Sequence, residues 1–438
     1  FLLIMSLIFY AWGEPKFIFI MLISIMANWL FGLAVDKFRD NKRAAHGYLT
    51  LMVLWNVSIF FVYKYLNFTI TNVNALFGTT FPLTKFVLPI GISFFTFQAM
   101  SYVIDVYRGN GSVQKNPLNV ALYITFFPQL IAGPIVRYET VANEIKNRKE
   151  TLDDFSLGIK RFIYGLSKKL ILSNLAAAAA DKAFALTDYS GVSAAMAWFC
   201  ALCYSLQILF DFSGYSDMAT GLGKMLGFEF PKNFDHPYIS NSISEFWRKW
   251  HITLGSWFRS YVYIPLGGNR NGNFKTYRNL FITWALTGLW HGASWNFILW
   301  GLFFGVLIII ERLGFGKILE KLPSAVSMLY TFVMVLFGWV LFDTDTLADA
   351  GRYYAAMFGA GGSLVDSYAR YTIASNAVML TLCILISGGL GSRLISFCEE
   401  KNKRASAVAG VAVKIGGLLI CTAYLVGATY NPFLYFRF

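Results

Sequence analysis

Charged residues are scarce in this chain of 438 residues: they make up 14%, whereas hydrophobic residues make up 56% and the mean hydropathy is +0.53. A soluble protein of this composition would expose too much apolar side chain, so the composition excludes that class. The longer apolar runs reach or approach the ~20 residues with which an α-helix crosses a bilayer. They are 15–35, 83–104, 193–210, 293–310, 325–342, 373–391 and 405–428. We therefore expect an all-α polytopic membrane protein.

Shorter or charge-bearing apolar stretches add candidates for spans, half-spans or re-entrant segments. They are 49–66, 117–136, 157–180 and 278–291. Together the runs predict roughly ten to twelve crossings within a single transmembrane domain over 1–438. The chain is apolar from Phe1 and has neither the basic region nor the small-residue cleavage site of a signal peptide. We expect it to start inside a helix whose beginning is missing.

The chain also lacks the clustered basic face that nucleic-acid binding needs, although Lys and Arg outnumber Asp and Glu by 37 to 24. The basic residues lie between the apolar runs, around 37–43, 146–161 and 401–404, and the positive-inside rule assigns these loops to the cytoplasm. The uncharged loop 67–80 and the acid-rich loop 343–349 then lie outside. If 405–428 crosses once, the C-terminal tail 429–438 emerges on the outer side.

Motifs for metal, redox and phosphate chemistry are missing. Cys200 and Cys203 form a C-x-x-C on an apolar helix without a second pair or a histidine at ligand spacing, so we expect core residues and no metal. Gly221-x-Gly223 lacks the rest of a phosphate loop. Neither sequence repeats nor the paired broken helices of a transporter are visible. Unusual residues concentrate from Asp211 to Trp300, so we expect one site and a catalytic core at about 205–312.

Histidine is rarer still, with four residues, and two of them directly follow a tryptophan. His291 lies within a long apolar run that only tryptophans, Gly288 and Gly292 interrupt. A membrane-buried imidazole needs a partner or a function, and the neighbouring glycine suggests room for an approaching molecule. Imidazole is the side chain best suited to acid–base chemistry at neutral pH. Since no serine or cysteine nucleophile motif lies nearby, the pattern predicts that His291 activates an acceptor hydroxyl for direct transfer.

The second Trp-His pair lies on an amphipathic segment. Ser242-x-x-Glu245 is a capping box, which predicts a helix from there to about Tyr261. Its aromatic and basic faces indicate a helix at the cytoplasmic membrane surface. His251 lies on the aromatic face, and the residues alone leave open whether it is functional or a bland interfacial histidine. We expect His236, which precedes a proline, to be structural.

Two acidic residues, Asp211 and Asp217, interrupt an apolar run in LFDFSGYSDMATGLG. Carboxylates do not remain unpaired in hydrocarbon. One interpretation places them at a helix end, where Ser and Asp accept hydrogen bonds from free backbone N–H groups. The other places them in the wall of a polar cavity, which makes Asp217 a substrate-binding candidate. Both interpretations remain open at this point.

A set of ordered motifs carries a resemblance that covers nearly the whole chain. They are YAWGEP (10–15), FFPQLIAGPIVRY (126–138), DFSGYSDMATGLGKMLGF (211–228), EFWRKWHITLGSWFRSYVYIPLGGNR (245–270), TGLWHGASWNFILWG (287–301) and GWVLFDTDTLADA (338–350). With them the chain resembles the membrane-bound O-acyltransferase (MBOAT) family, in the bacterial AlgI/PatA-type branch that O-acetylates alginate, peptidoglycan and other envelope polysaccharides. The resemblance implies a bundle with re-entrant and interfacial helices around a central funnel, in the bacterial cytoplasmic membrane.

The resemblance also implies residue roles. The catalytic histidine of the family falls on His291 and its second histidine on His251, which would position or polarise the thioester or shuttle a proton. Trp250 and Trp290 would line the acyl channel. The donor would be a cytoplasmic thioester, most simply acetyl-CoA, with no bound cofactor or metal. The acyl group would leave outward to an extracytoplasmic polysaccharide, helped by an SGNH-type acetyltransferase partner.

The tail NPFLYFRF resembles the C-terminal motif of the small DltX protein that works with the related D-alanyl transferase DltB. Tyr435 is therefore a candidate acyl relay, and the alternative is an aromatic anchor at the membrane boundary. A DltB-like D-alanyl transferase for teichoic acid is the nearest alternative function, although its match to the proline motif at 126–138 is looser. A polysaccharide or lipid transporter without chemistry and a non-catalytic export scaffold are the alternatives outside the family.

Overall fold

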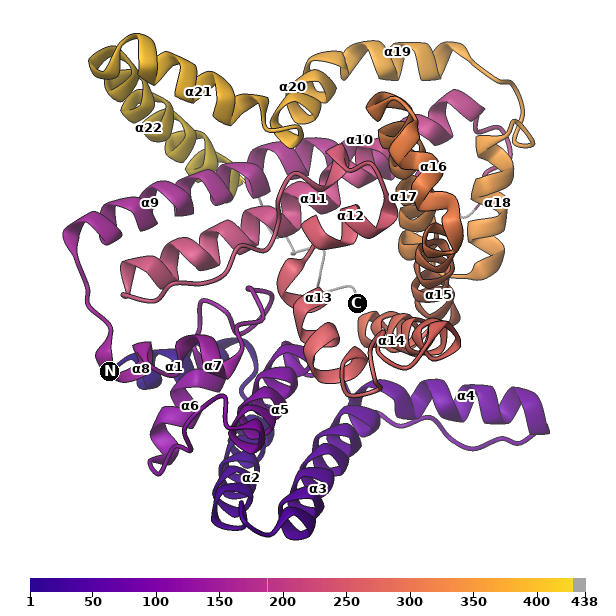
Figure 1. Ribbon diagram of the computed structural model, residues 1–438. Helices are drawn as coiled ribbons and strands as arrows, with labels where there is room; N and C mark the ends of the chain where they lie inside the picture. The colour runs from indigo at the N-terminus through magenta and orange to yellow at the C-terminus, as the bar shows by residue number, and fades with distance from the viewer. Residues whose placement is uncertain (187, 428–438) are drawn as a thin grey trace. The chain divides into compact units, whose positions relative to one another are not determined.

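The computed structural model describes residues 1–186 and 188–427, and among these residues it contains helices and loops without strands (Figure 1). The prediction of an all-α fold is therefore confirmed. Tyr435 and the tail to which it belongs lie outside the described residues. The described residues contain six helices that are long and apolar enough to cross a membrane. They are Ile18–Lys37, Lys42–Phe77, Ala194–Met225, Trp295–Lys321, Ser324–Asp343 and Val408–Gly427.

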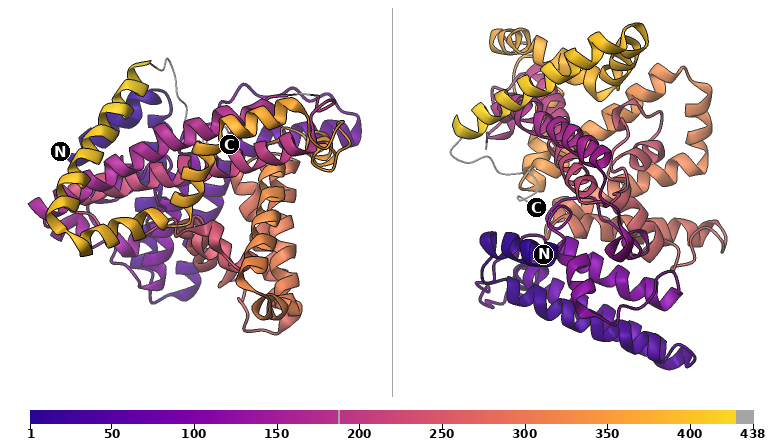
Figure 2. Two further views of the ribbon diagram at one scale, coloured as in Figure 1. Left: turned by 90° about the horizontal axis from the view of Figure 1, so that it is seen from above. Right: turned by 90° about the vertical axis from the view of Figure 1, so that its left-hand side faces the viewer.

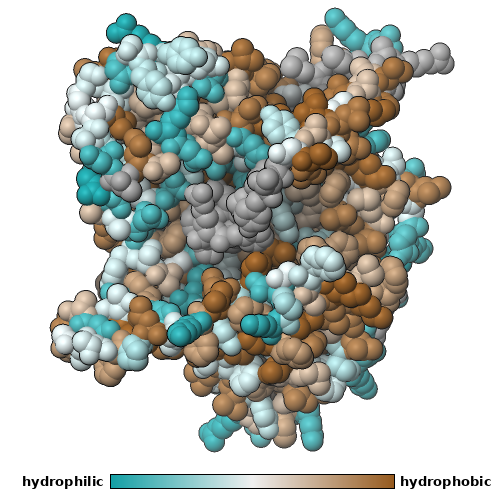
Figure 3. All heavy atoms as spheres, turned by 180° about the vertical axis from the view of Figure 1, so that it is seen from behind, coloured by the Kyte–Doolittle hydropathy of each residue, from teal (hydrophilic) through white to brown (hydrophobic). Residues whose placement is uncertain are grey.

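A seventh span would be the bent pair of α19 (Ser367–Ser375) and α20 (Ala377–Ser387), whose axes meet at 56°. Many large apolar side chains along these helices are exposed, and broad hydrophobic areas cover the face drawn in Figure 3. Lipid tails cover such surfaces in a membrane protein. The chain is thus a multi-pass membrane protein, and the expected ten to twelve crossings stay a prediction.

Some expected spans form shorter elements. The run 83–104 begins with extended chain, and α5 (Ile92–Arg108) starts only after Gly91. The run 117–136 forms α6 (Pro117–Thr125), whose N-cap Asn116 accepts a hydrogen bond from the N–H of Leu118 and whose first residue is the proline that suits this position. The proline motif that follows is a loop, because prolines lack the N–H that a continuing helix needs.

The chain forms two compact units. The first comprises residues 1–159, 219–231 and 256–262, and the second comprises 160–218, 232–255 and the chain from 263 onward. The first unit contains these helices: α1 (Leu2–Gly13), α2 (Ile18–Lys37), α3 (Lys42–Phe60), the π-segment η1 (Phe61–Tyr65), α4 (Leu66–Phe77), α5, α6, α7 (Tyr138–Val141), α8 (Glu144–Asn147) and the start of α9 (Leu152–Ser167).

Helices α2, α3 and α5 pack side by side in the first unit (Figure 1), and Figure 2 shows this part of the chain in indigo and purple. Asn28 of α2 and Asn56 of α3 exchange two amide hydrogen bonds of 3.1 and 2.9 Å, and both residues are buried. Polar side chains between apolar helices associate in this way, because the alternative is an unsatisfied polar group in an apolar environment. The pair fixes the position of α2 against α3.

The second unit contains the remaining elements. They are η2 (Lys168–Ser173), α10 (Asn174–Phe184), α11 (Ala194–Met225), η3 (Pro237–Ile239), α12 (Ile243–Lys249), α13 (Ile252–Phe258), η4 (Arg259–Tyr263), α14 (Asn273–His291), α15 (Trp295–Ile310), η5 (Glu311–Phe315), α16 (Gly316–Lys321), α17 (Ser324–Asp343), α18 (Leu347–Met357), α19, α20, α21 (Leu390–Lys401) and α22 (Lys403–Gly427). The ends of α11 and α13 and most of η4 fall in the first unit.

Helices α14 and α15 form a tight hairpin in the second unit. Gly288 of α14 and Gly301 of α15 face each other, and a Cβ on Gly288 would lie far inside van der Waals contact of the carbonyl oxygen of Phe297. Small residues let helix backbones approach closely within membranes. The glycines therefore set the position of the last turn of α14, which carries His291.

Candidate functional site

The segment around His251 is a broken helix. Helix α12 begins as the capping box predicts, because Ser242 Oγ accepts a hydrogen bond of 3.0 Å from the N–H of Glu245. The predicted continuation to Tyr261 is wrong at one point: the chain leaves the helix at Trp250, and α13 begins only at Ile252. His251 between them has a φ of 44°, a left-handed conformation that costs free energy for a residue with a Cβ. Such strain persists only where surrounding contacts impose it.

The segment at 233–235 supplies those contacts. The N–H of Asp235 donates to the carbonyl oxygen of Lys249, and the N–H of Ile252 donates to the carbonyl oxygen of Asn233, both at 2.9 Å. A helix break leaves backbone groups unpaired, and buried backbone groups require partners. The extended segment therefore satisfies both sides of the break, and His251 is held between them.

The side chain of Asn233 determines the protonation of His251. Its Oδ1 accepts hydrogen bonds from the N–H of Thr253 at 3.2 Å and from the Thr253 hydroxyl at 2.9 Å. A backbone N–H only donates, so the atom that faces it is the amide oxygen. The same Oδ1 lies 3.1 Å from Nδ1 of His251, which makes Nδ1 the protonated nitrogen of the neutral ring. Nε2 then carries the lone pair.

His251 is buried, with 2% of its surface exposed, and burial lowers the pKa of its ring from 6.5 to about 3. Aromatic rings surround it: the centroid of Phe212 lies at 4.6 Å, that of Trp290 at 6.3 Å and that of Phe234 at 6.4 Å. Nε2 has no hydrogen-bond partner among the described residues. The ring is a neutral imidazole with an available acceptor nitrogen in an apolar environment, which is uncommon for a purely structural histidine.

His291 is the last residue of α14 and is also buried. Its ring packs edge-on against Trp290 and Trp300, with both centroids at 4.9 Å, and against Phe342 at 5.3 Å. The expectation that Gly292 leaves room beside this histidine is wrong. The ring of Phe297 occupies that space, so a Cβ on Gly292 would overlap it. Any approach to His291 comes from another side.

Trp290 links the two histidines. Its indole contacts the ring of His251 at a centroid distance of 6.3 Å and that of His291 at 4.9 Å, and all three residues belong to the second unit. The structure thus brings together three residues that the sequence singled out. Trp250 packs close by, with Trp339 at 4.8 Å and Phe234 at 5.1 Å. The assignment of Trp250 and Trp290 to an acyl channel stays a prediction.

The two acids of α11 lie inside the helix, because α11 runs without interruption to Met225. The helix-cap interpretation is therefore wrong. Asp217 forms ion pairs with Arg161 at 3.1 Å and Lys168 at 2.8 Å, and Asp211 pairs with Lys169. The basic partners come from the neighbouring helix formed by α9 and η2. These pairs satisfy the charges that an apolar helix would otherwise leave isolated.

Asp217 also lines a cavity of about 570 Å³ in the second unit, which supports the cavity-wall interpretation. The polar lining residues include Arg161, Lys168, Ser213 and Ser216 from the two helices, and Lys232, Asn233 and His236 from the loop before α12. Neither His251 nor His291 is among the lining residues, whereas Asn233 and Phe234, which contact His251, are. The cavity therefore ends one residue away from His251.

His236 also lines the cavity, and the expectation that it is structural stays a prediction. It shows a φ of 46°, and its Nδ1 donates a 3.0 Å hydrogen bond to the carbonyl oxygen of Ser387.

The sequence interpretation missed Asn233, although it lies in the same segment, FPKNFDHP. The only signal was the pair of prolines, which predicts an extended segment beside the helix. No group of three or more metal-ligating side chains occurs in the part of the chain that the structure describes, and the expected absence of metal stays a prediction.

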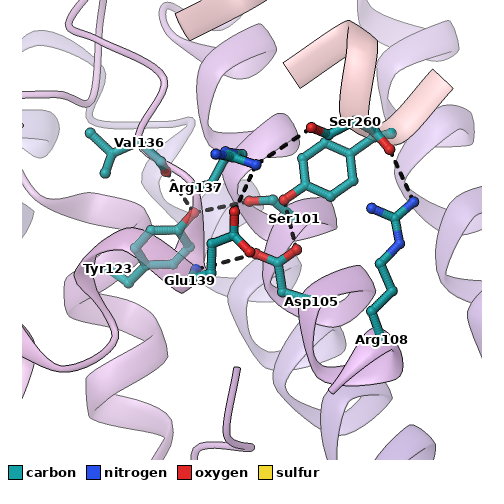
Figure 4. Close-up of polar contacts among 9 residues, drawn as sticks. Ser101, Asp105, Arg108, Tyr123, Val136, Arg137, Glu139 and Ser260 are labelled. Carbon is teal, nitrogen blue, oxygen red and sulfur yellow. Dashed lines mark hydrogen bonds and ion pairs between the residues drawn. The ribbon is translucent and has the colours of Figure 1, made fainter. Parts of the chain in front are cut away.

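The first unit contains a polar cluster around the proline motif (Figure 4). Asp105 of α5 accepts a 2.8 Å hydrogen bond from the Tyr261 hydroxyl and a 3.2 Å bond from the N–H of Glu139. Arg137 pairs with Glu139 at 2.7 Å, and its guanidinium reaches the hydroxyl of Ser260 at 3.4 Å. The cluster ties the end of the proline motif and the π-segment η4 to α5. It gives two of the sequence motifs a common structural role.

Comparisons with known proteins show the family of the chain. The model of the membrane-bound O-acyltransferase family matches residues 45–341. A Pseudomonas putida protein named "Probable alginate O-acetylase AlgI" is 40% identical over 100% of this chain and 94% of its own length. The peptidoglycan O-acetyltransferase of Helicobacter pylori is 32% identical over 100% of this chain and 91% of its length. The teichoic acid D-alanyltransferase of Bacillus subtilis is 30% identical over 58% of this chain and 68% of its length. The chain belongs to the membrane-bound O-acyltransferase family and is an acyltransferase.

Proposed function

We propose that this protein is an O-acetyltransferase of a bacterial cytoplasmic membrane. It moves an acetyl group from acetyl-CoA on the cytoplasmic side to an extracytoplasmic polysaccharide of the alginate or peptidoglycan type. The observation that carries the proposal is the similarity over the full chain to relatives named for O-acetylation, whereas the D-alanyl relative matches 58% of the chain. An SGNH-type partner outside the membrane would complete transfer to the polymer.

The chemistry needs one base and a water-poor site, because a thioester is already activated. The acceptor hydroxyl oxygen attacks the thioester carbonyl carbon while the imidazole of His291 takes its proton. The bond between carbon and sulfur then breaks, and the leaving thiolate recovers that proton. His291 suits this role because its buried ring packs among Trp290, Trp300 and Phe342, which exclude water.

His251 acts differently. With its proton on Nδ1, its Nε2 accepts a hydrogen bond and does not donate one. This supports a role in holding the acceptor hydroxyl or relaying its proton, and it argues against polarisation of the thioester carbonyl by Nε2. The low pKa of its ring keeps it neutral at physiological pH. The two histidines thus have separate functions on either side of their contact with Trp290.

The test uses purified full-length protein in liposomes with labelled acetyl-CoA and a polysaccharide acceptor, wild type against His291→Ala. We expect label to leave acetyl-CoA with the wild type and the rate to fall about 10²–10⁴-fold in the variant. D-alanyl-loaded carrier protein serves as the alternative donor. Transfer from that carrier but not from acetyl-CoA would assign the protein to the D-alanyl class. Equal consumption of acetyl-CoA by wild type and variant would reject His291 as the base, and no consumption of either donor would favour a transporter or scaffold.

A further inference from the structure

We propose that Asn233 is a positioning residue of the transfer site, and that its amide N–H groups donate hydrogen bonds to an oxygen of the acyl donor in the adjacent cavity. The inference rests on the proposed acyl transfer for the identity of the donor. Its positioning part rests on contacts alone. No motif of the sequence points to this residue.

Four hydrogen bonds converge on Asn233. Its carbonyl oxygen accepts the N–H of Ile252, and its Oδ1 accepts from the backbone and the hydroxyl of Thr253 and from Nδ1 of His251. Asn233 therefore closes one side of the helix break and selects the tautomer of His251. Without it, either ring nitrogen of His251 carries the proton, and the left-handed backbone at this position loses its support.

The other end of the same amide is the nitrogen Nδ2. Asn233 is 2% exposed, and its Nδ2 has no hydrogen-bond partner among the described residues. A buried amide nitrogen without a partner is destabilising. Asn233 lines the 570 Å³ cavity, so a ligand oxygen in that cavity would recover this cost. The fixed Oδ1 contacts hold the amide plane in one orientation, which makes Nδ2 a preorganised donor.

The cavity wall is also charged. Its lining includes Arg161, Lys168 and Lys232; Asp217 pairs with the first two, and Asp235, which is outside the lining, pairs with Lys232 at 2.6 Å. Positive side chains therefore outnumber negative ones in the wall, which suits an anionic molecule. A thioester whose carrier arm bears phosphate combines this charge with a carbonyl oxygen. The donor carbonyl would then accept a hydrogen bond from Nδ2 of Asn233. The ring of His251 contacts Oδ1 at the other end of the same amide.

The test compares Asn233→Asp, Asn233→Ala and the control Asn279→Asp. Asp keeps the acceptor oxygen for Thr253 and His251 but lacks the amide donor, and it places a negative charge next to His251. Asn279 is another fully buried asparagine of the second unit, where its Nδ2 donates to the carbonyl oxygen of Gly268, away from the histidines. We expect kcat for acetyl transfer to fall about 10²–10³-fold in both Asn233 variants, and the control to keep its kcat per folded protein.

A second readout is the pH dependence of rate and of stability, and the stability measurement does not need the donor. The ring neighbours Phe212, Asn233, Phe234 and Trp290 carry no charge, so a carboxylate at position 233 would be the charge that His251 meets first. In Asn233→Asp, His251 should take up a proton near neutral pH, and the pH–rate profile should gain an acidic limb that Asn233→Ala and Asn279→Asp lack. The thermal stability of Asn233→Asp below pH 6.5 should also depend less on pH than that of the wild type.

Wild-type kcat and an unchanged pH profile in Asn233→Asp would overturn the proposal. So would equal kcat losses in Asn233→Asp and Asn279→Asp with no change in the pH dependence of stability, because such losses report packing alone. If Asn233→Ala does not fold, Asn233→Asp still decides, since it retains the acceptor contacts. A wild type that does not consume acetyl-CoA would reject the proposed donor instead, and the stability readout would still test the positioning role.

Discussion

The Oδ1 of Asn233 lies 3.1 Å from Nδ1 of His251, and the same oxygen accepts the backbone N–H of Thr253. This single relationship fixes the amide orientation, places the ring proton on Nδ1 and leaves Nε2 as the acceptor. It also explains how a histidine with a left-handed backbone persists between two helices. These contacts are a physical argument for a functional His251 that is independent of family membership, and the role itself stays a prediction.

The stability of the protein should fall as the pH falls below about 6.5. The ring of His251 has a pKa of about 3 in the folded state and an ordinary value of 6.5 when exposed, so the unfolded chain binds a proton that the folded chain excludes. The free energy of unfolding should decrease by up to about 1.4 kcal/mol per pH unit between pH 6.5 and 3 and then level off.

The contribution of His251 to this pH dependence is isolated by comparing wild type with His251→Gln in denaturant titrations at several pH values. The difference between the two proteins should shrink towards pH 3, because Gln at this position does not titrate. The exposed His46→Gln is the control. A wild type and a His251→Gln protein with parallel stability curves would show that His251 is accessible to protons in the folded state.

The hydrogen bond between Tyr261 and Asp105 should stabilise the first unit. Tyr261→Phe leaves the carboxylate of Asp105 without its 2.8 Å partner, so the free energy of unfolding should fall by about 1–3 kcal/mol. Tyr107→Phe, on the half-exposed side of the same helix α5, is the control. A double-mutant cycle with Asp105→Ala should give a coupling energy of about 0.5–3 kcal/mol, and additive effects would contradict a direct interaction.

Gly288→Ala should separate α14 from α15. The added methyl group would overlap the carbonyl oxygen of Phe297, which is backbone and moves only with its helix. We expect a loss of about 1–3 kcal/mol in the free energy of unfolding, together with reduced transfer because His291 lies one turn further along α14. Gly351→Ala is the matched control, since nothing lies within 4 Å of a Cβ there. Equal melting temperatures of the two variants would argue against the tight hairpin.

Tyr435→Phe tests whether the C-terminal tail relays the acyl group. The substitution retains an aromatic ring for the membrane boundary and removes the hydroxyl that would carry an acetyl ester. If Tyr435 is the relay, polymer acetylation should stop while acetyl-CoA binding persists, and mass spectrometry of the wild type should find acetyl on the tail peptide. Unchanged polymer acetylation in the variant would leave the anchor as the role of this residue.

The sequence alone determined the class of the protein, because apolar runs of membrane-spanning length and the scarcity of charge reflect composition and local order. It also located the start of α12, since the capping box Ser242-x-x-Glu245 involves residues one turn apart. His291 was identified in the same way, as an ionisable ring in an apolar run. Local patterns thus sufficed for the fold class, the helix start and the family to which the chain belongs.

Only the tertiary structure decided how the site is built, because its contacts join residues that are distant in sequence. Asn233 reaches across to His251, Arg161 pairs with Asp217, and Phe297 fills the space beside Gly292. No periodicity encodes such pairings. The break of the helix at His251 belongs here too, since the local sequence favours a continuous helix. Hydrogen bonds from the segment at 233–235 outweigh that preference and place the ring against Trp290.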